Sequence, residues 1–267
     1  MVFDPKLWGT SFNEARIPPL PCPTCRHGRL VLVPDTIQKL QAAHNVKTMN
    51  DEDSIPEMFT QKFALFLKCS TPDCGEIVSV YGDTRTVETY DDDEFGQSCL
   101  AYVEELEPKG MYPAPPIIEL PEEIPYKVRH QLQMAFGFLW TDIGASANRV
   151  RASIERILDD AQTPVKANSR TDKLYRLDLA QRIEQFKIKA GADHADTMTA
   201  LRYVGNLGSH GEHLTRDALL DAFRIYEDAL AELYGNRSTV IKSLREKIIS
   251  TKGSLPLRLK QGRLLGS

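Results

Sequence analysis

The sequence predicts an α+β protein in which a small β-rich module is followed by an all-α helical bundle. Three observations lead to this prediction. The first half carries two pairs of closely spaced cysteines, each flanked by strand-like sequence. A proline-rich run lies near the middle of the chain. From Pro125 onward, apolar residues recur every three or four positions, which is the helical period.

Length and composition describe an ordinary globular protein. The 267 residues suffice for one or two domains, and contents of 42% apolar and 26% charged residues are typical. No apolar run reaches the length of about 18 residues that a membrane span needs. The N-terminal MVFDPKLWG also lacks the basic and apolar regions of a signal peptide. We therefore expect no membrane association and a cytoplasmic location.

Charge is distributed unevenly along the chain. Residues 1–125 hold 21 acidic and 10 basic side chains, a net charge of −11. Residues 126–267 hold 16 acidic and 23 basic side chains, a net charge of +7. A basic half can attract a polyanion such as RNA, whereas an acidic half repels one.

A domain boundary is expected where the charge changes sign. The run Tyr112–Pro125 (YPAPPIIELPEEIP) cannot continue a helix or a central strand, because proline lacks the N–H group and fixes φ. The predicted organisation is a cysteine-containing module at 1–111, a linker at 112–125, a helical bundle at 126–253 and a flexible basic tail at 254–267.

Four of the five cysteines form two tight pairs. Cys22 and Cys25 stand in a C-x2-C motif, and Cys69 and Cys74 in a C-x4-C motif. In a cytosolic chain such pairs favour a metal over a disulfide. Tetrahedral Zn²⁺ prefers four such ligands, so we expect a structural zinc site. The alternative is a set of reduced structural thiols whose spacing is accidental. His27 and His44 are weaker ligand candidates. The fifth cysteine, Cys99, is expected to be a small buried apolar group.

Strand-like sequence surrounds both cysteine pairs in the manner of a zinc ribbon. The expected strands are RLVLV at 29–33, FALFLK at 63–68 and IVSVY at 77–81. The 43 residues between Cys25 and Cys69 exceed what a minimal ribbon needs. We expect a helix at 35–44 and an acidic loop at 51–57 there. The module is acidic and includes the acidic run 91–94, so it is poorly suited to contact nucleic acid. We favour instead a role in docking a partner protein or in supporting the bundle.

The second half is predicted to be helical throughout, without strands. Apolar spacing and end signals indicate helices at 122–144, 146–161, about 179–190, from 193, 215–234 and 238–249. The helix from Asp193 carries the segment LRYVGNLGSHGE, in which Arg202, Asn206 and His210 recur every four residues and share one face. The alternative is a polar helix end, since the glycines of this segment could end the helix before His210.

The helical half resembles the domain of unknown function family 4145, which is usually placed near the HEPN helical bundles. The resemblance covers roughly residues 121–234 and rests on LRYVGNLGSH, its position before a long amphipathic helix, and the preceding RVRASIERIL. It implies metal-independent RNA cleavage by a dimer, in which Arg202, Asn206 and His210 are the catalytic residues. Seven residues separate Arg202 from His210, whereas HEPN nucleases have four to six between the corresponding pair.

Three functions are therefore considered. The first is a homodimeric HEPN-like ribonuclease, of the kind found in bacterial toxin and phage-defence systems. The second is a non-catalytic dimeric adaptor or sensor that docks a partner protein through the acidic zinc module. The third is an accessory subunit of a DNA-processing defence complex. Four basic residues could form a rim that contacts substrate: Lys127, Arg129, Arg149 and Arg151. The alternative is that they belong to a charged outer helix face.

Overall fold

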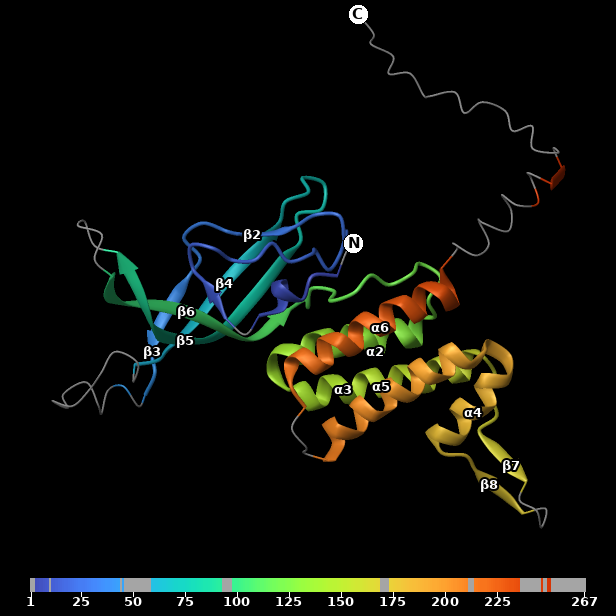
Figure 1. The fold of residues 1–267 in the computed structure, drawn as a ribbon. Helices are drawn as coiled ribbons and strands as arrows, with labels where there is room; N and C mark the ends of the chain where they lie inside the picture. Colours follow the sequence, from blue (N-terminus) through green and yellow to red (C-terminus); the bar gives the residue numbers. More distant parts are fainter. Residues whose placement is uncertain are drawn as a thin grey trace, which may run out of the picture.

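The chain folds as a mixed α+β protein, with a β-rich N-terminal half whose sheet is curled and a helical C-terminal half (Figure 1). The structure is a computed structural model, and it describes residues 3–9, 11–43, 45, 59–92, 98–168, 173–210, 214–235, 246, 249 and 250, with the backbone alone at 91, 92, 209 and 210. The predicted α+β class is confirmed.

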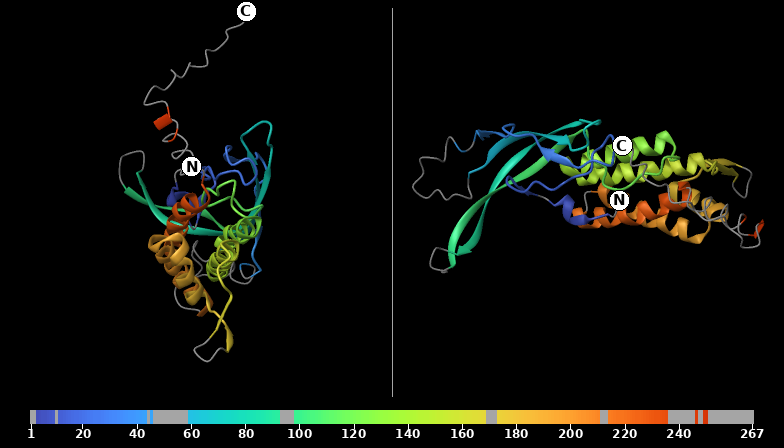
Figure 2. Two further views of the ribbon diagram at one scale, coloured as in Figure 1. Left: turned by 90° about the vertical axis from the view of Figure 1, so that its right-hand side faces the viewer. Right: turned by 90° about the horizontal axis from the view of Figure 1, so that it is seen from above.

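One antiparallel sheet forms the N-terminal half, after a short 3-10 helix η1 (Pro5–Trp8). The strand order is β1-β6-β5-β4-β2, and β3 also pairs with β4. The strands are β1 (Phe12–Asn13), β2 (Leu30–Leu32), β3 (Gln38–Gln41), β4 (Gln61–Cys69), β5 (Ile77–Asp92) and β6 (Ser98–Tyr112). In Figure 2 the distal part of the β5–β6 hairpin extends away from the helices.

Alternation of side chains explains the central strand. In β4 the buried residues are Phe63, Leu65, Leu67 and Cys69, and the residues between them are exposed. The hairpin beside it contains an irregularity at Tyr81/Gly82, where the register of β5 on β6 shifts. A Cβ atom at Gly82 would lie 2.0 Å from the Glu107 carbonyl oxygen, so the close approach of β5 to β6 at this irregularity requires glycine.

Two expectations for the N-terminal half are wrong, and one long strand was not expected. The helix expected at 35–44 is replaced by strand β3, which pairs along the edge of β4. Residues 98–112 form strand β6, which was not predicted from the sequence because the burial of its side chains alternates only weakly. Cys99 is exposed near the start of this strand and is therefore not the buried apolar group that we expected. The acidic loop at 51–57 lies outside the described residues.

The C-terminal half contains five described helices and one small hairpin. They are α2 (Tyr126–Thr141), α3 (Ile143–Asp160), β7 (Lys166–Asn168), β8 (Leu174–Arg176), α4 (Leu179–Ala190), α5 (Ala192–His210) and α6 (Arg216–Tyr234). The β7–β8 hairpin contradicts the expectation of a strand-free second half. The helix expected at 238–249 and the tail at 254–267 lie almost entirely outside the described residues.

Local capping decides where the helices begin. Asp142 separates α2 from α3, and its carboxylate accepts a hydrogen bond from the Ala145 N–H at 2.9 Å. The first helix therefore ends before Gly144, where the sequence had indicated its end. Asp178 and Gln181 form a reciprocal capping box at α4. Thr215 caps α6 by accepting from the Ala218 N–H.

The two halves share one continuous core. Trp140 of α2 lies 6.2 Å from the Trp8 ring and 5.8 Å from the Phe12 ring, between centroids. The Arg216 guanidinium at the start of α6 lies 5.0 Å from the Trp140 ring centroid, and it donates to the Trp8 carbonyl oxygen at 3.4 Å. The N-terminal segment is thus held against both α2 and α6.

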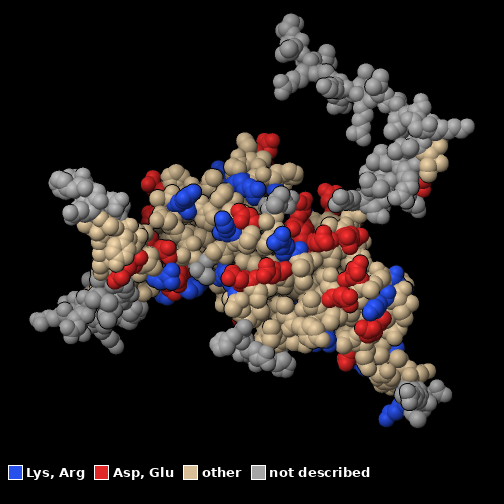
Figure 3. Space-filling model, viewed as in Figure 1, with Lys and Arg blue, Asp and Glu red and all other residues tan. Residues whose placement is uncertain are grey.

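Two surface properties bear on function. Among the described helices, none combines the length and apolar character that crossing a bilayer requires. On the face shown in Figure 3, acidic and basic side chains are interspersed over both halves of the molecule. The net charge difference between the halves therefore does not appear on this face as two areas of single sign.

Candidate metal centre and arginine-bearing helix

The four predicted cysteines converge on one point. The sulfur atoms of Cys22, Cys25, Cys69 and Cys74 all lie within 4.8 Å of one another. The first pair precedes β2, whereas the second connects the end of β4 to the start of β5. Pairing of Leu30 on β2 with Cys69 on β4 brings the two loops together. This group of sulfur atoms, the cysteine cluster, can hold a metal ion.

The spacing of the sulfur atoms suits tetrahedral coordination. Cys22 Sγ lies 3.7 Å from Cys74 Sγ, and Cys25 Sγ lies 3.6 Å from Cys69 Sγ. Four sulfurs at about 2.3 Å from a central Zn²⁺ would be about 3.8 Å apart. The same distances are far longer than a disulfide bond, and all four residues are free cysteines.

Backbone amides surround the cluster and favour negatively charged sulfur. The N–H groups of Thr24, Gly28 and Thr71 donate to Cys22, Cys25 and Cys69 Sγ at 3.4, 3.3 and 3.4 Å.

The two thiols of the first pair lie in different environments. The hydrogen bond from the Gly28 N–H is the main cause that lowers the pKa of Cys25 to about 6. Burial raises the pKa of Cys22 to about 12. A cation at the centre would offset this cost of burial by stabilising the Cys22 thiolate.

Of the two histidines considered as ligands, His27 does not join the cluster. His27 is exposed, and its Nδ1 is hydrogen bonded to the Cys25 carbonyl oxygen. His44 lies outside the described residues. Within the described part of the chain, the cluster is therefore a four-thiol set.

Helix α5 carries the predicted Arg–Asn–His face and continues through its glycines to His210. Arg202 and Asn206 are partly buried, while the side chain of His210 lies outside the described atoms. The glycines do not end the helix, because they face α3. A Cβ atom at Gly208 would lie 2.7 Å from the Gly144 carbonyl oxygen, and one at Gly205 would lie 2.6 Å from Arg151 Cβ.

Arg202 packs against an aromatic ring. Its guanidinium carbon lies 4.8 Å from the centroid of the Tyr203 ring, and its Nε is shielded from water without a hydrogen-bond acceptor. No ion pair joins it to any carboxylate among the described residues. Its positive charge is therefore not neutralised by an acidic side chain in the described part of the chain.

Most of the expected basic rim has structural contacts instead. Arg129 donates to the carbonyl oxygens of Pro121 at 2.7 Å and Glu122 at 3.2 Å. Arg149 donates to the Gln131 side chain at 3.3 Å and lies over the Phe138 ring. Lys127 is exposed, and Arg151 lies at the α3–α5 contact. Arg129 and Arg149 are therefore already engaged in contacts within the protein.

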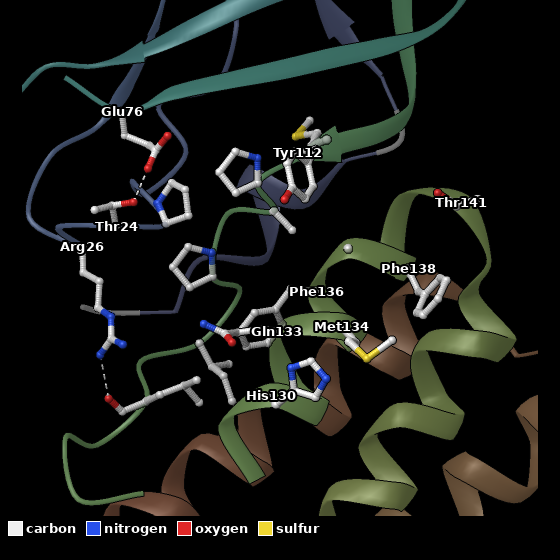
Figure 4. A pocket seen from close by; sticks show the side chains of 18 residues that line it. Thr24, Arg26, Glu76, Tyr112, His130, Gln133, Met134, Phe136, Phe138 and Thr141 are labelled. Atoms are coloured by element: carbon white, nitrogen blue, oxygen red, sulfur yellow. Dashed lines mark hydrogen bonds between the residues drawn. The ribbon is translucent and has the colours of Figure 1, made fainter. Parts of the chain in front are cut away.

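A cavity of about 770 Å³ lies between the first cysteine loop and α2. In Figure 4, His130 and Gln133 reach toward it from α2, opposite Thr24, Arg26 and Glu76. Arg26 donates to the Leu120 carbonyl oxygen at 3.1 Å, and Thr24 donates to Glu76. The charged groups of the wall are therefore already paired. The sequence contains no motif for this cavity, because its walls come from separate segments.

In comparisons with known proteins, two family models each match a part of the chain. A family model described as Domain of unknown function (DUF8608) matches residues 10–111, and another described as Domain of unknown function (DUF4145) matches residues 133–254. No curated protein and no solved structure matches the chain. The second match confirms the family resemblance of the helical half and includes the Arg–Asn–His segment. Neither description names an activity.

Proposed function

We propose that this protein is a HEPN-like ribonuclease that cleaves RNA without a catalytic metal ion, and that its cysteine cluster holds a structural Zn²⁺ in a zinc-ribbon-like module. The observation that carries the ribonuclease proposal is the Arg202 guanidinium, which has no acidic partner among the described residues. A phosphate group would supply the missing negative charge.

The proposed reaction is transfer of the phosphodiester to the neighbouring ribose hydroxyl. The 2′ oxygen forms a bond to phosphorus while the bond from phosphorus to the 5′ oxygen breaks. The products are a 2′,3′-cyclic phosphate and a 5′ hydroxyl. His210 serves as general base for the 2′-OH proton or as general acid for the leaving 5′ oxygen, because imidazole titrates near neutral pH. Arg202 stabilises the charge that develops on the phosphorus oxygens.

Asn206 and a second protomer complete this proposal. Asn206 lies one turn after Arg202 on α5, where its amide can orient the imidazole or bind a phosphate oxygen. A homodimer formed through the bundle would bring two copies of the Arg–Asn–His set to one cleft. One His210 could then accept the proton while the other donates. Toxin or phage-defence activity is the biological setting that the resemblance to HEPN nucleases favours.

The test is incubation of the purified protein with end-labelled RNA in EDTA. We expect cleavage by the wild type, fragments that end in 2′,3′-cyclic phosphate, and loss of at least about 100-fold in rate for His210→Ala. His194→Ala is the matched control, since His194 lies on the same helix beside Glu232 and should leave the rate unchanged. Cleavage that requires added metal, or equal rates for both variants, would exclude the proposal.

The cavity beside the cysteine cluster supports a second candidate, a non-catalytic sensor or adaptor. Its volume falls in the range of about 300–1,000 Å³ that is usual for ligand sites, and residues of both halves line it. Occupancy of this cavity could alter the contact between the cysteine loop and α2. The RNA assay separates the candidates, because a sensor of this kind would leave RNA intact.

A further inference from the structure

Two arginines from neighbouring helices flank Gly205. Arg151 belongs to α3, and its aliphatic portion crosses α5 at this glycine: a Cβ atom at Gly205 would lie 2.6 Å from Arg151 Cβ and 3.3 Å from Arg151 Cδ. Arg202 precedes Gly205 by one helical turn on α5. Glycine at 205 therefore lets α3 and α5 approach closely at Arg151, one helical turn from Arg202.

Neither arginine has an acidic partner in the described part of the chain. The Nε atoms of Arg151 and Arg202 are both shielded from water without an acceptor. By contrast, Arg156 of α3 donates to Asp159 at 2.9 Å, and Arg182 of α4 donates to the same carboxylate at 2.8 Å, although the Arg182 Nε also lacks an acceptor. A buried donor without an acceptor is destabilising, so an anion that accepts from these groups would be favoured.

An exposed aromatic ring lies beside Arg202. Tyr203 follows Arg202 directly and is 58% exposed, and its ring faces the Arg202 guanidinium with 4.8 Å between the centroid and the guanidinium carbon. Aromatic rings next to cations form the usual platform for unpaired bases, because a base stacks on the ring while its phosphate contacts the cation.

We propose that Arg151, Arg202 and Tyr203 form a binding site for single-stranded RNA, in which the two guanidinium groups bind a phosphate and the Tyr203 ring stacks on the adjoining base. The identification of the polyanion as RNA rests on the proposed ribonuclease function. The preference for single strands follows from the exposed ring, since a base within a duplex cannot stack on it. Arg151 is thereby a substrate-binding residue from a helix other than the one that carries the Arg–Asn–His set.

The test is fluorescence anisotropy with a fluorescein-labelled 2′-O-methyl oligouridylate, which lacks the nucleophilic hydroxyl and so is not consumed. We expect the dissociation constant to rise at least about tenfold for Arg151→Gln. The slope of the logarithm of the binding constant against the logarithm of salt concentration should decrease by the amount that corresponds to about one phosphate contact. Tyr203→Ala should weaken binding about fivefold or more without changing the salt dependence. The duplex of this strand with its complement should bind more weakly than the single strand.

The matched control is Arg156→Gln, which removes the same charge from the same helix at a residue already paired with Asp159. It should bind within about twofold of the wild type. Tyr203→Ala alters an exposed side chain, so it tests the site even if Arg151→Gln folds poorly by circular dichroism. Equal binding by Arg151→Gln and Arg156→Gln, normal binding by Tyr203→Ala, or no binding by the wild type would each overturn the site.

Failure of this inference is distinguishable from failure of the proposed function. RNA cleavage by the wild type together with unchanged binding by Arg151→Gln would leave the ribonuclease intact and remove the site. Conversely, binding that depends on Arg151 and Tyr203 without any cleavage of unmodified RNA would retain the site and exclude the nuclease.

Discussion

At the scale of single residues, the cysteine cluster depends on a glycine that lets its two halves approach each other. Gly28 follows the first cysteine pair and donates its N–H to Cys25 Sγ. A Cβ atom at this position would lie 2.3 Å from Cys69 Sγ and 2.5 Å from Thr71 Oγ1. Any other residue would therefore separate the two cysteine pairs. Cysteine spacing predicts the four sulfur ligands, whereas this steric requirement depends on how the two loops meet.

Zinc content tests the cluster directly. We expect about one zinc ion per chain in the wild type and well under half of that in Cys69→Ser, because three thiolates and a hydroxyl hold Zn²⁺ much less tightly than four thiolates. Elemental analysis after dialysis measures this ratio. The same variant should unfold at a lower temperature, since the binding energy of a structural zinc contributes to folding.

Cys99→Ser is the control for this measurement, since Cys99 is exposed on β6 and outside the cluster. It should retain the zinc content and the unfolding temperature of the wild type. Wild-type protein without zinc, or a Cys69→Ser variant with full zinc content, would rule out the assignment of the metal.

At the scale of elements, the contact between α3 and α5 depends on small residues rather than on large apolar ones. Gly144 and Ala147 of α3 meet Gly205 and Gly208 of α5 at distances that leave no room for another Cβ atom. From sequence alone, glycines in a helix indicate weak helix propensity, and a helix end before His210 was the alternative considered. Packing against α3 compensates for that propensity, and α5 continues to His210.

Paired glycine substitutions test this contact. Gly208→Ala should lower the free energy of unfolding by about 1–3 kcal/mol, because the new methyl group would lie 2.7 Å from the Gly144 carbonyl oxygen. Gly137→Ala in α2 should raise it by about 0.5–1 kcal/mol, because the new methyl group would only touch Ala114 Cβ at 3.7 Å. Urea unfolding measures both, and a stabilised Gly208→Ala variant would disprove the close contact.

Element types were predictable where one face of a segment is buried. The alternating residues of β4 and the helical spacing of α2, α3 and α6 follow directly from the sequence. Strands β3 and β6 were missed, since β3 is an edge strand with mostly exposed side chains and the distal part of β6 alternates weakly. The β7–β8 hairpin is short and exposed, so it leaves no apolar pattern to detect.

The candidate sites also differ in whether a local sequence pattern predicts them. Ligand spacing along the chain indicated the cysteine cluster, and helical periodicity indicated that Arg202 and Asn206 share a face. The role proposed for Arg151 and the cavity beside His130 arise from contacts between distant segments. Such contacts depend on tertiary packing, which a local pattern does not specify.

At the scale of the whole molecule, an aromatic junction joins the two halves. Trp140 contacts Trp8 and Phe12 from the N-terminal half, and Arg216 lies over its ring from α6. The cavity between the cysteine loop and α2 lies along the same boundary. A ligand or partner that enters this cavity would contact both halves.

Loss of the junction should separate the unfolding of the two halves. Trp140→Ala is expected to lower the free energy of unfolding by about 3–5 kcal/mol, because it removes a large buried side chain. The chain has two tryptophans, so Trp8 fluorescence alone then reports on the N-terminal half, while far-UV circular dichroism is dominated by the helices. In the wild type both signals should change at one urea concentration, and in Trp140→Ala at two.

Phe223→Ala is the matched control for this experiment, because Phe223 is fully buried against Phe136 within the bundle. It should destabilise the protein by a similar amount while the two signals stay coincident, since the junction at Trp140 is left intact. Coincident transitions in Trp140→Ala would show instead that other contacts, such as those between α2 and β6, suffice to couple the halves.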